Sequence, residues 1–362
     1  MNRFLSILYP LLLLCGCSCG RTTYSDSESA KPSLPDDFLR GMTFAHEGYR
    51  GHNGYGGNTV GPSLDSLQRM HVNAVSIVPY TFMRETDRLE ELPVPDHYGA
   101  ENDGAVRNCI RQAHERGLFV LLKPQIWVRG AWPGEIDFNT ASDWDHFFNA
   151  YTEWMLHYAA MCQEEEIEAL CIGTELVNTT LKHPDKWKEM IDTIRTVYDG
   201  KLTYAANWGR EFENITFWSE LDAIGLNGYY PLSFEARPTD AELVRGARSW
   251  MGMADSVSLA YDRPLWLTEI GYRSVEGAWM NPHAEAGERP VSLNAQYRCY
   301  DALAAAAVRS TRLRGMFIWK WPSYLGHNEG RDGRNIGFVP GGKPAGAVLS
   351  RLYADPVISP GS

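Results

Sequence analysis

Two short apolar stretches decide the fold of this chain: EALCIGTEL at residues 168–176 and RPLWLTEIGY at residues 263–272. Both lack the polar alternation of a half-exposed strand, which is typical of parallel strands buried on both faces. Each apolar run ends at a glutamate, Glu175 in the first and Glu269 in the second. Because such strand ends open onto a cleft, we expect both carboxyl groups to face it.

A pair of carboxyl groups across a cleft suits retaining glycoside hydrolysis. In that chemistry one carboxyl group protonates the leaving oxygen, and a second, about 5 Å away, attacks the sugar carbon. The alternative is that each glutamate ends its strand in a buried ion pair with a structural role. The matching settings of Glu175 and Glu269 favour catalysis.

Six more runs resemble these two, so the sequence predicts eight strands, at 41–45, 73–80, 118–124, 169–175, 201–207, 222–229, 264–270 and 314–321. Amphipathic segments between them predict helices at 63–71, 102–116, 142–166, 184–198, 239–260 and 292–312. The longest is expected to begin at Ser142, with Asp145 as its capping partner. Between the fifth and sixth strands there is room for only one short helix. Strands alternating with helices predict an α/β chain forming a single (β/α)8 TIM barrel.

Side-chain alternation predicts how the glutamates reach the interior of the barrel. The faces expected to point inward carry Cys171, Gly173 and Glu175 on the fourth strand, and Leu265, Leu267 and Glu269 on the seventh. On the sixth strand, Tyr229 shares a face with Asn227, and its phenol could keep a nucleophilic carboxylate ionised.

Aromatic and polar residues at other strand ends complete the predicted cleft. Trp319 and Trp321 are expected on one face of the last strand, where a tryptophan can form the floor of a sugar subsite. Each of these residues could instead be a packing residue. The other candidates for substrate binding follow the first, third and fifth strands: His46, Lys123, Gln125, Trp127, Trp132, Asn207 and Trp208.

The first residues, MNRFLSILYPLLLLCGCSCG, have one arginine, an apolar core and then small residues with cysteine, as in a secretory signal. The stretch 14–17 resembles a lipobox, in which the last cysteine, here Cys17, becomes lipidated. Cleavage by an ordinary signal peptidase is the alternative. We expect an exported protein, lipid-anchored to a bacterial membrane, at the outer membrane or cell surface. The expected divisions are a signal peptide at 1–16, a lipidated tether at 17–37, the barrel at 38–354 and a tail at 355–362.

Charge and composition narrow the partners. The net charge is −11 and no basic run is present, which argues against nucleic acid as a partner. The cysteines and histidines show no metal-ligand spacing, and the expected chemistry requires neither a metal nor an organic cofactor. We therefore expect a polysaccharide or oligosaccharide substrate, with membrane contact through the lipid anchor only. The oligomeric state is left open.

Five strings resemble glycoside hydrolase family 113, known for endo-acting β-1,4-mannanases: LLKPQIWV, SDWDHFF, CIGTEL, LTEIGY and WKWPSY followed by GGKPA. The resemblance covers roughly residues 38–352. This family belongs to clan A, whose members are retaining (β/α)8 enzymes, and the resemblance implies that Glu175 is the acid/base and Glu269 the nucleophile.

Two positions depart from the relatives' pattern. Thr174 stands where many members of the clan have an asparagine that contacts the sugar 2-hydroxyl, so Asn207 or Asn227 is expected to make that contact. Gln125 stands where relatives carry histidine, which could shift the substrate preference away from mannan.

The expected function is therefore hydrolysis of a β-linked glycan by double displacement, with β-1,4-mannan favoured. One alternative is the same mechanism on a different β-linked glycan. Another is a catalytically idle surface barrel that binds glycans, which a hydrolysis assay separates from an enzyme. A Schiff-base lyase using Lys123 is a third, and borohydride trapping of an imine would reveal it.

The lipobox yields a direct prediction. Changing Cys17→Ser removes the lipid acceptor, so the protein should move from the membrane fraction of its native host into soluble fractions. Fractionation followed by immunoblotting measures this shift. Unchanged membrane partition of the variant would contradict lipidation at Cys17.

Overall fold

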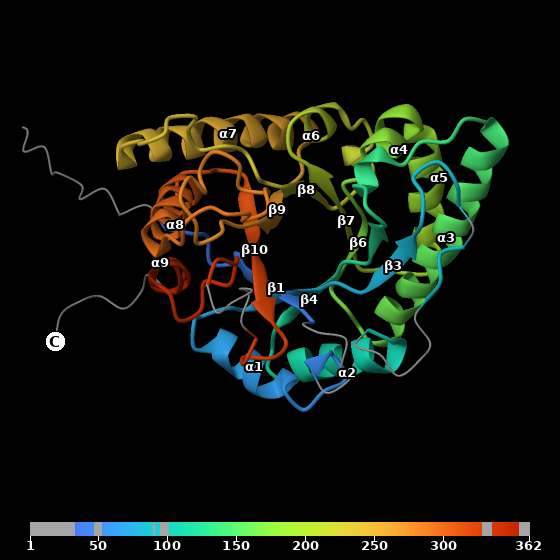
Figure 1. The fold of residues 1–362 in the computed structure, drawn as a ribbon. Helices are drawn as coiled ribbons and strands as arrows, with labels where there is room; N and C mark the ends of the chain where they lie inside the picture. The colour runs from blue at the N-terminus through green and yellow to red at the C-terminus, as the bar shows by residue number, and fades with distance from the viewer. Residues whose placement is uncertain (1–32, 47–52, 90, 95–100, 328–334, 355–362) are drawn as a thin grey trace, which may run out of the picture. The chain divides into compact units, whose positions relative to one another are not determined.

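The computed structural model describes residues 33–46, 53–89, 91–94, 101–327 and 335–354 (Figure 1). These residues belong to one compact unit, Ser33–Ser362. The predicted signal peptide, the tether up to residue 32 with Cys17, and the tail at 355–362 lie outside the described residues. Within the described ranges, no helix is both long and apolar enough to cross a membrane.

Eight parallel strands close into a barrel, which confirms the predicted (β/α)8 TIM fold. Their order around the barrel is β1, β2, β4, β6, β7, β8, β9 and β10, and β10 pairs with β1 to close it. The strands are β1 (Leu39–Ala45), β2 (Ala74–Ile77), β4 (Phe119–Leu122), β6 (Ala169–Thr174), β7 (Lys201–Asn207), β8 (Ala223–Asn227), β9 (Leu265–Ile270) and β10 (Leu313–Pro322).

Helices surround this barrel, as the view in Figure 1 shows. They are α1 (Val60–Gln68), α2 (Asp103–His114), α3 (Ala141–Glu164), α4 (Val177–Lys182), α5 (Pro184–Arg195), α6 (Arg210–Asn214), α7 (Asp240–Tyr261), α8 (Leu293–Ala307) and α9 (Pro344–Tyr353), with short 3-10 turns at Pro133–Glu135 and Trp218–Glu220. The segment between β7 and β8 holds only the short α6 and one such turn, as expected. Helix α9 was not predicted from the sequence.

Helix α3 begins earlier than its sequence predicts. Its N-cap is Thr140, whose hydroxyl oxygen accepts a hydrogen bond from the Asp143 backbone N–H at 3.1 Å. The prediction of Ser142 and Asp145 was therefore wrong by two positions, because Thr140–Asp143 has the same spacing of capping residues.

Two barrel strands are followed by an additional ribbon that the sequence did not predict. Strands β3 (Tyr80–Met83) and β5 (Gln125–Val128) pair in parallel outside the barrel sheet. Pro79 precedes β3 and Pro124 precedes β5. Because proline has no N–H to donate, each interrupts the ladder of its barrel strand, and the chain then pairs again in a separate sheet.

The apolar residues form two layers. A large cluster fills the space between barrel and helices, and a smaller cluster fills the barrel interior. The inner cluster combines two aromatic side chains, Trp266 and Phe317, with one leucine and otherwise small residues. The others are Ala74, Leu121, Ala169, Cys171, Ala205 and Ala223.

Candidate active site

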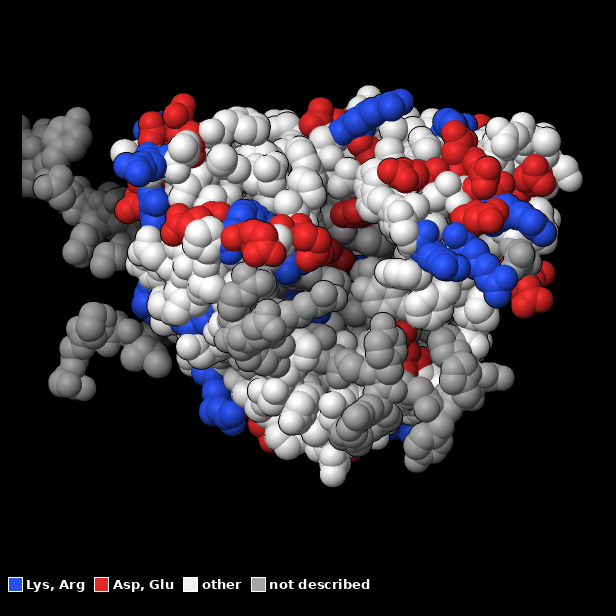
Figure 2. Space-filling model, viewed as in Figure 1, with Lys and Arg blue, Asp and Glu red and all other residues white. Residues whose placement is uncertain are grey.

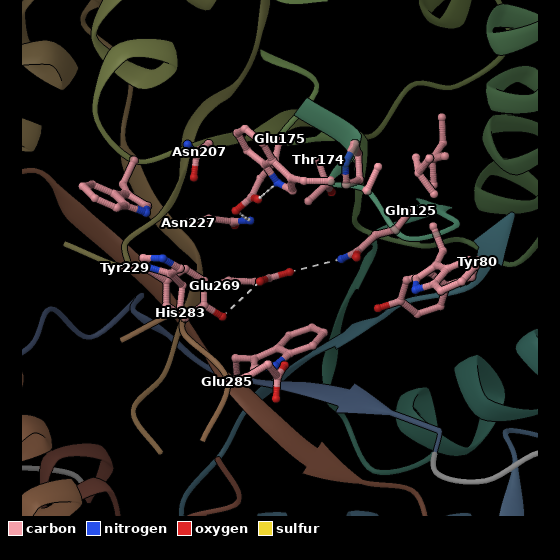
Figure 3. A pocket seen from close by; sticks show the side chains of 18 of the residues that line it. Tyr80, Gln125, Thr174, Glu175, Asn207, Asn227, Tyr229, Glu269, His283 and Glu285 are labelled. Carbon is pink, nitrogen blue, oxygen red and sulfur yellow. Dashed lines mark hydrogen bonds between the residues drawn. The ribbon is translucent and has the colours of Figure 1, made fainter. Parts of the chain in front are cut away.

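A cavity of about 560 Å³ opens at the C-terminal ends of the barrel strands (Figure 3). Figure 2 shows this face of the molecule hollowed near its centre, with acidic side chains inside the hollow. Both Glu175 and Glu269 line the cavity. The other polar residues on its wall are Tyr80, Gln125, Thr174, Asn207, Asn227, Tyr229, Arg273, His283 and Glu285, and its aromatic residues without a hydroxyl are Trp127, Trp132, Trp208, Trp319 and Phe338.

Glu175 reaches the cavity through a local change in the backbone. The register of β6 against β7 shifts between Cys171 and Thr174, and Glu175 has φ of 53°, in the left-handed region. As a result Thr174 lines the cavity together with Glu175. Simple alternation, which placed Thr174 on the opposite face, was wrong at this strand end, because a bulge turns consecutive residues toward one side.

Glu269 also depends on an irregular register. Leu265 and Leu267 were predicted to point inward with Glu269, but both lie in the outer core, whereas Trp266 fills the barrel interior. The pairing of β9 shifts just before Glu269, whose partner on β8 is Asn227. This shift turns Glu269 into the cavity even though the leucines of its predicted face point outward.

Donors from the end of β4, the start of β5 and the chain after β8 surround the Glu269 carboxylate. Lys123, fully buried after β4, forms an ion pair with Oε1, and the Gln125 amide donates to the same oxygen at 3.1 Å. The Tyr229 phenol donates to Oε2 at 3.1 Å, the contact expected from the sequence. A nearby positive charge and several donors stabilise the ionised form of a carboxyl group.

Glu175 has different surroundings. Its hydrogen-bond donors are neutral. The Asn227 amide donates to Oε1 at 2.9 Å, and the Trp132 indole N–H donates to Oε2 at 2.7 Å. Burial, and next the charge of Glu269, raise the pKa of Glu175, while the two hydrogen bonds oppose that rise. Glu175 is therefore the carboxyl group of this pair that is favoured to carry a proton.

A third glutamate, Glu211 on α6, lies buried behind the acid site, and the sequence did not predict its role. Its Oε1 accepts from the Tyr204 hydroxyl at 2.6 Å, and its Oε2 accepts from the Asn207 N–H at 2.6 Å. The Tyr204 oxygen accepts in turn from the N–H of Leu176, directly after Glu175. Glu211 thus connects the chain beside Glu175 to the end of β7.

Burial raises the pKa of Glu211 to about 8. The hydrogen bonds that Glu211 accepts from the Tyr204 hydroxyl, the Asn207 N–H and, at 2.8 Å, the Thr180 hydroxyl oppose this rise, and burial outweighs them.

The two predicted tryptophans of β10 lie on different sides. Trp319 lines the cavity, whereas Trp321 is buried in the outer core, where its indole donates to Ser63 Oγ at 3.0 Å. Between these residues the β10 register shifts against β1. The prediction of one shared face was therefore wrong, and Trp321 has the position of a packing residue.

The remaining candidates differ in their distance from the cavity. Asn207, Trp208, Gln125 and Trp127 line it, and so does Trp132. Lys123 lies beneath it, paired with Glu269 and 5.8 Å from the Trp319 ring centroid, so it supports a carboxylate and does not line the wall.

His46 does not line the cavity either. It pairs with Glu101, whose other oxygen accepts from the Tyr80 backbone N–H at 2.6 Å, and Tyr80 does line the wall. Two residues, Glu101 and Tyr80, therefore separate His46 from a molecule in the cavity.

The sequence did not predict the part of the cavity wall that is formed by the chain after β9. Arg273 pairs with Glu285 at 2.9 Å, and its guanidinium lies 4.3 Å from the Phe338 ring centroid. His283 faces Trp208, with ring centroids 5.8 Å apart. These residues come from loops with no periodic pattern, so only the position of Arg273 shortly after Glu269 could have indicated them. Among the described residues, no group of His, Cys, Asp and Glu side chains could hold a metal ion.

The raised pKa of Glu211 predicts how the free energy of unfolding depends on pH. Because its folded pKa, about 8, lies above the ordinary 4.5, the folded chain binds more protons between these values. The free energy of unfolding should therefore fall as pH rises through this window, by up to about 1.4 kcal/mol per pH unit from this group. A Glu211→Gln variant cannot titrate, so its slope should be shallower in urea unfolding from pH 5 to pH 8.

Glu213→Gln is the matched control, because Glu213 lies on the same helix but is exposed. Its slope should equal that of the unaltered chain. Equal slopes for the Glu211 variant and the unaltered chain would show that Glu211 is ionised throughout.

The family model of Glycoside Hydrolase Family 113 matches residues 42–343. A solved family 113 β-mannanase from Alicyclobacillus acidocaldarius, in complex with ManMIm, is 30% identical with a TM-score of 0.75, and the match covers 87% of this chain and 97% of that one. A second structure, of a family 113 β-1,4-mannanase complex, is 25% identical with a TM-score of 0.77, covering 87% and 98%.

A family 5 mannosidase from Rhizomucor miehei shares the fold, with a TM-score of 0.57 at 11% identity, covering 89% of this chain and 96% of that one. The search of curated proteins found no match. Since the family model spans nearly the whole barrel that carries this cavity, the chain belongs to glycoside hydrolase family 113.

Proposed function

We propose that this glycoside hydrolase cleaves β-1,4-linked mannan or its oligosaccharides with retention of configuration, with Glu175 as acid/base and Glu269 as nucleophile. The observation that carries the proposal is the contrast between the two carboxyl groups in one cavity. Glu269 is paired with an ammonium group, whereas Glu175 has neutral donors and a raised pKa. Such a contrast separates an attacking carboxylate from a proton donor.

In the first step an oxygen of the Glu269 carboxylate bonds to the anomeric carbon and the glycosidic C–O bond breaks. The leaving oxygen takes the proton from Glu175. Tyr229 and Gln125, which hold Glu269 in place, limit the freedom of the attacking oxygen.

Formation of the glycosyl ester prepares Glu175 for the second step. The ester removes the negative charge of Glu269, which is one cause of the raised pKa of Glu175, while Lys123 keeps its lowering influence. The pKa of Glu175 therefore falls, and its carboxylate can accept a proton from water. The water oxygen bonds to the anomeric carbon, the ester bond breaks, and the Glu269 carboxylate is restored.

The mannan preference rests on relatives. The two solved family 113 proteins are a β-mannanase and a β-1,4-mannanase. Asn207 and Asn227 both line the cavity, and either amide could contact the sugar 2-hydroxyl in place of the asparagine that Thr174 replaces. Asn227 already donates to Glu175, which leaves Asn207 as our choice for that contact.

We also propose that the enzyme acts outside the cytoplasm, attached to a membrane by lipid on Cys17. Support comes from the sequence of residues 1–17 alone. A polymeric glycan that cannot cross a membrane would then meet the enzyme at the surface of the cell.

The hydrogen bond from Trp132 predicts a change in pH dependence. Trp132→Phe keeps an aromatic ring but removes the N–H that lowers the pKa of Glu175, so that pKa should rise further. Glu175 would then stay protonated to higher pH, and the basic limb of kcat/KM should move upward. Trp127→Phe removes an indole N–H elsewhere in the cavity and should leave this limb in place. A downward move for Trp132→Phe would overturn the acid role of Glu175.

The roles of the two glutamates can be separated by the anomeric configuration of products. Glu175→Ala should still form the glycosyl ester from an activated aryl glycoside, and azide should give a β product. It should lose about 10²- to 10⁴-fold on poor leaving groups. Glu269→Ala cannot form the ester, and azide attacking from the opposite face should give the α product. Proton NMR of the anomeric signals distinguishes them, and swapped configurations would refute the assignment.

A further inference from the structure

One face of the β3–β5 ribbon continues outward from the catalytic cavity. Tyr80 and Gln125 start this face and line the cavity, and Gln125 contacts Glu269. Phe82 and Trp127 come two residues later on their strands and pair in register. Two residues of a strand span about 7 Å, which is comparable with the length of one sugar unit.

The two outer aromatic side chains are open to solvent. Phe82 is 51% exposed and Trp127 is 49% exposed, and their rings meet edge to face with centroids 5.9 Å apart. The opposite face of the ribbon is already buried, so this pair adds little to the apolar core. Among the described residues, three of the five exposed aromatic side chains lie beside this cleft: Phe82, Trp127 and Trp132, but not Phe234 or Tyr324.

A second hollow, of about 690 Å³, lies along the same ribbon. Trp127 lines both this hollow and the catalytic cavity, so the two share a wall. Phe82, Glu91 and Arg129 also line the second hollow. It therefore combines aromatic surfaces with a carboxylate that can accept, and a guanidinium that can donate, hydrogen bonds with sugar hydroxyls.

The ribbon is fastened to its surroundings on its buried side. Thr81 Oγ1 donates to the Pro93 carbonyl oxygen at 2.7 Å, which ties β3 to the chain that follows it. Within the ribbon, the Arg129 N–H continues the β3–β5 ladder by donating to the Met83 carbonyl oxygen at 3.0 Å. A surface that is already ordered loses less conformational entropy when a ligand binds than a flexible one.

We propose that Phe82 and Trp127 form a remote sugar-binding subsite, which holds a further unit of the same β-linked glycan whose cleavage occurs between Glu175 and Glu269. This inference rests on the proposed function and adds to it that the enzyme prefers long chains. The flat C–H face of a pyranose can stack on an aromatic ring without any charged partner. The shared wall at Trp127 makes one continuous glycan the occupant of both hollows.

The test compares kcat/KM on β-1,4-mannooligosaccharides from disaccharide to hexasaccharide. For the unaltered enzyme, kcat/KM should rise with chain length. In Phe82→Ala and in Trp127→Ala the ratio of hexasaccharide to disaccharide should fall about tenfold, since one stacking contact of this kind is worth about one factor of ten. Phe234→Ala, an exposed aromatic residue that lines neither hollow, is the matched control and should keep the ratio.

Two results separate this inference from the proposed function. If the unaltered enzyme cleaves no mannooligosaccharide, the mannan assignment fails. If it cleaves them but both variants keep the unaltered ratio, with folding confirmed by circular dichroism, the mannan assignment stands and the remote subsite is overturned. A Phe234→Ala ratio that falls equally would also overturn it, because the effect would then not be local.

Discussion

The buried ion pair between Lys123 and Glu269 is the interaction on which the site depends. Lys123 is fully buried and Glu269 nearly so, and they join β4 to β9 across the barrel. Removing one partner of such a pair leaves an uncompensated buried charge, at a cost of about 3 to 5 kcal/mol. Their mutual attraction therefore keeps an anion at the cavity floor. That anion in turn raises the pKa of Glu175. The ion pair therefore helps to give the two carboxyl groups different chemical properties.

Irregular strand ends convert a regular barrel into this site. Register shifts occur near the end of β6, near the end of β9 and within β10, beside Glu175, Glu269 and Trp319 respectively. A strictly alternating strand would turn every second side chain away from the cavity. The shifts let neighbouring residues such as Thr174 and Glu175 line the same wall of the cavity. Hydrogen bonds from Leu176 N–H to Tyr204, and from Tyr204 to the buried Glu211, hold the chain after Glu175 in place.

The β3–β5 ribbon lengthens the cleft beyond the barrel itself. Prolines end the ladders of β2 and β4, and the chain that follows forms a separate pair of strands whose outer face starts at Gln125. A ribbon with one buried and one exposed face can display aromatic side chains without loosening the core, because its buried face already supplies the packing.

The sequence by itself determined the eight strands, the barrel they form, and the positions of Glu175 and Glu269 at strand ends, because burial on both faces leaves a continuous apolar pattern that any window reveals. It also indicated Tyr229 at Glu269. Tertiary structure alone decided which side chains face the cavity: the register shifts that turn Glu269 into it and Trp321 away from it, the pairing of Lys123, and the role of Glu211. These depend on how neighbouring strands slide against one another and on contacts between residues far apart in the chain, and no local periodicity records either.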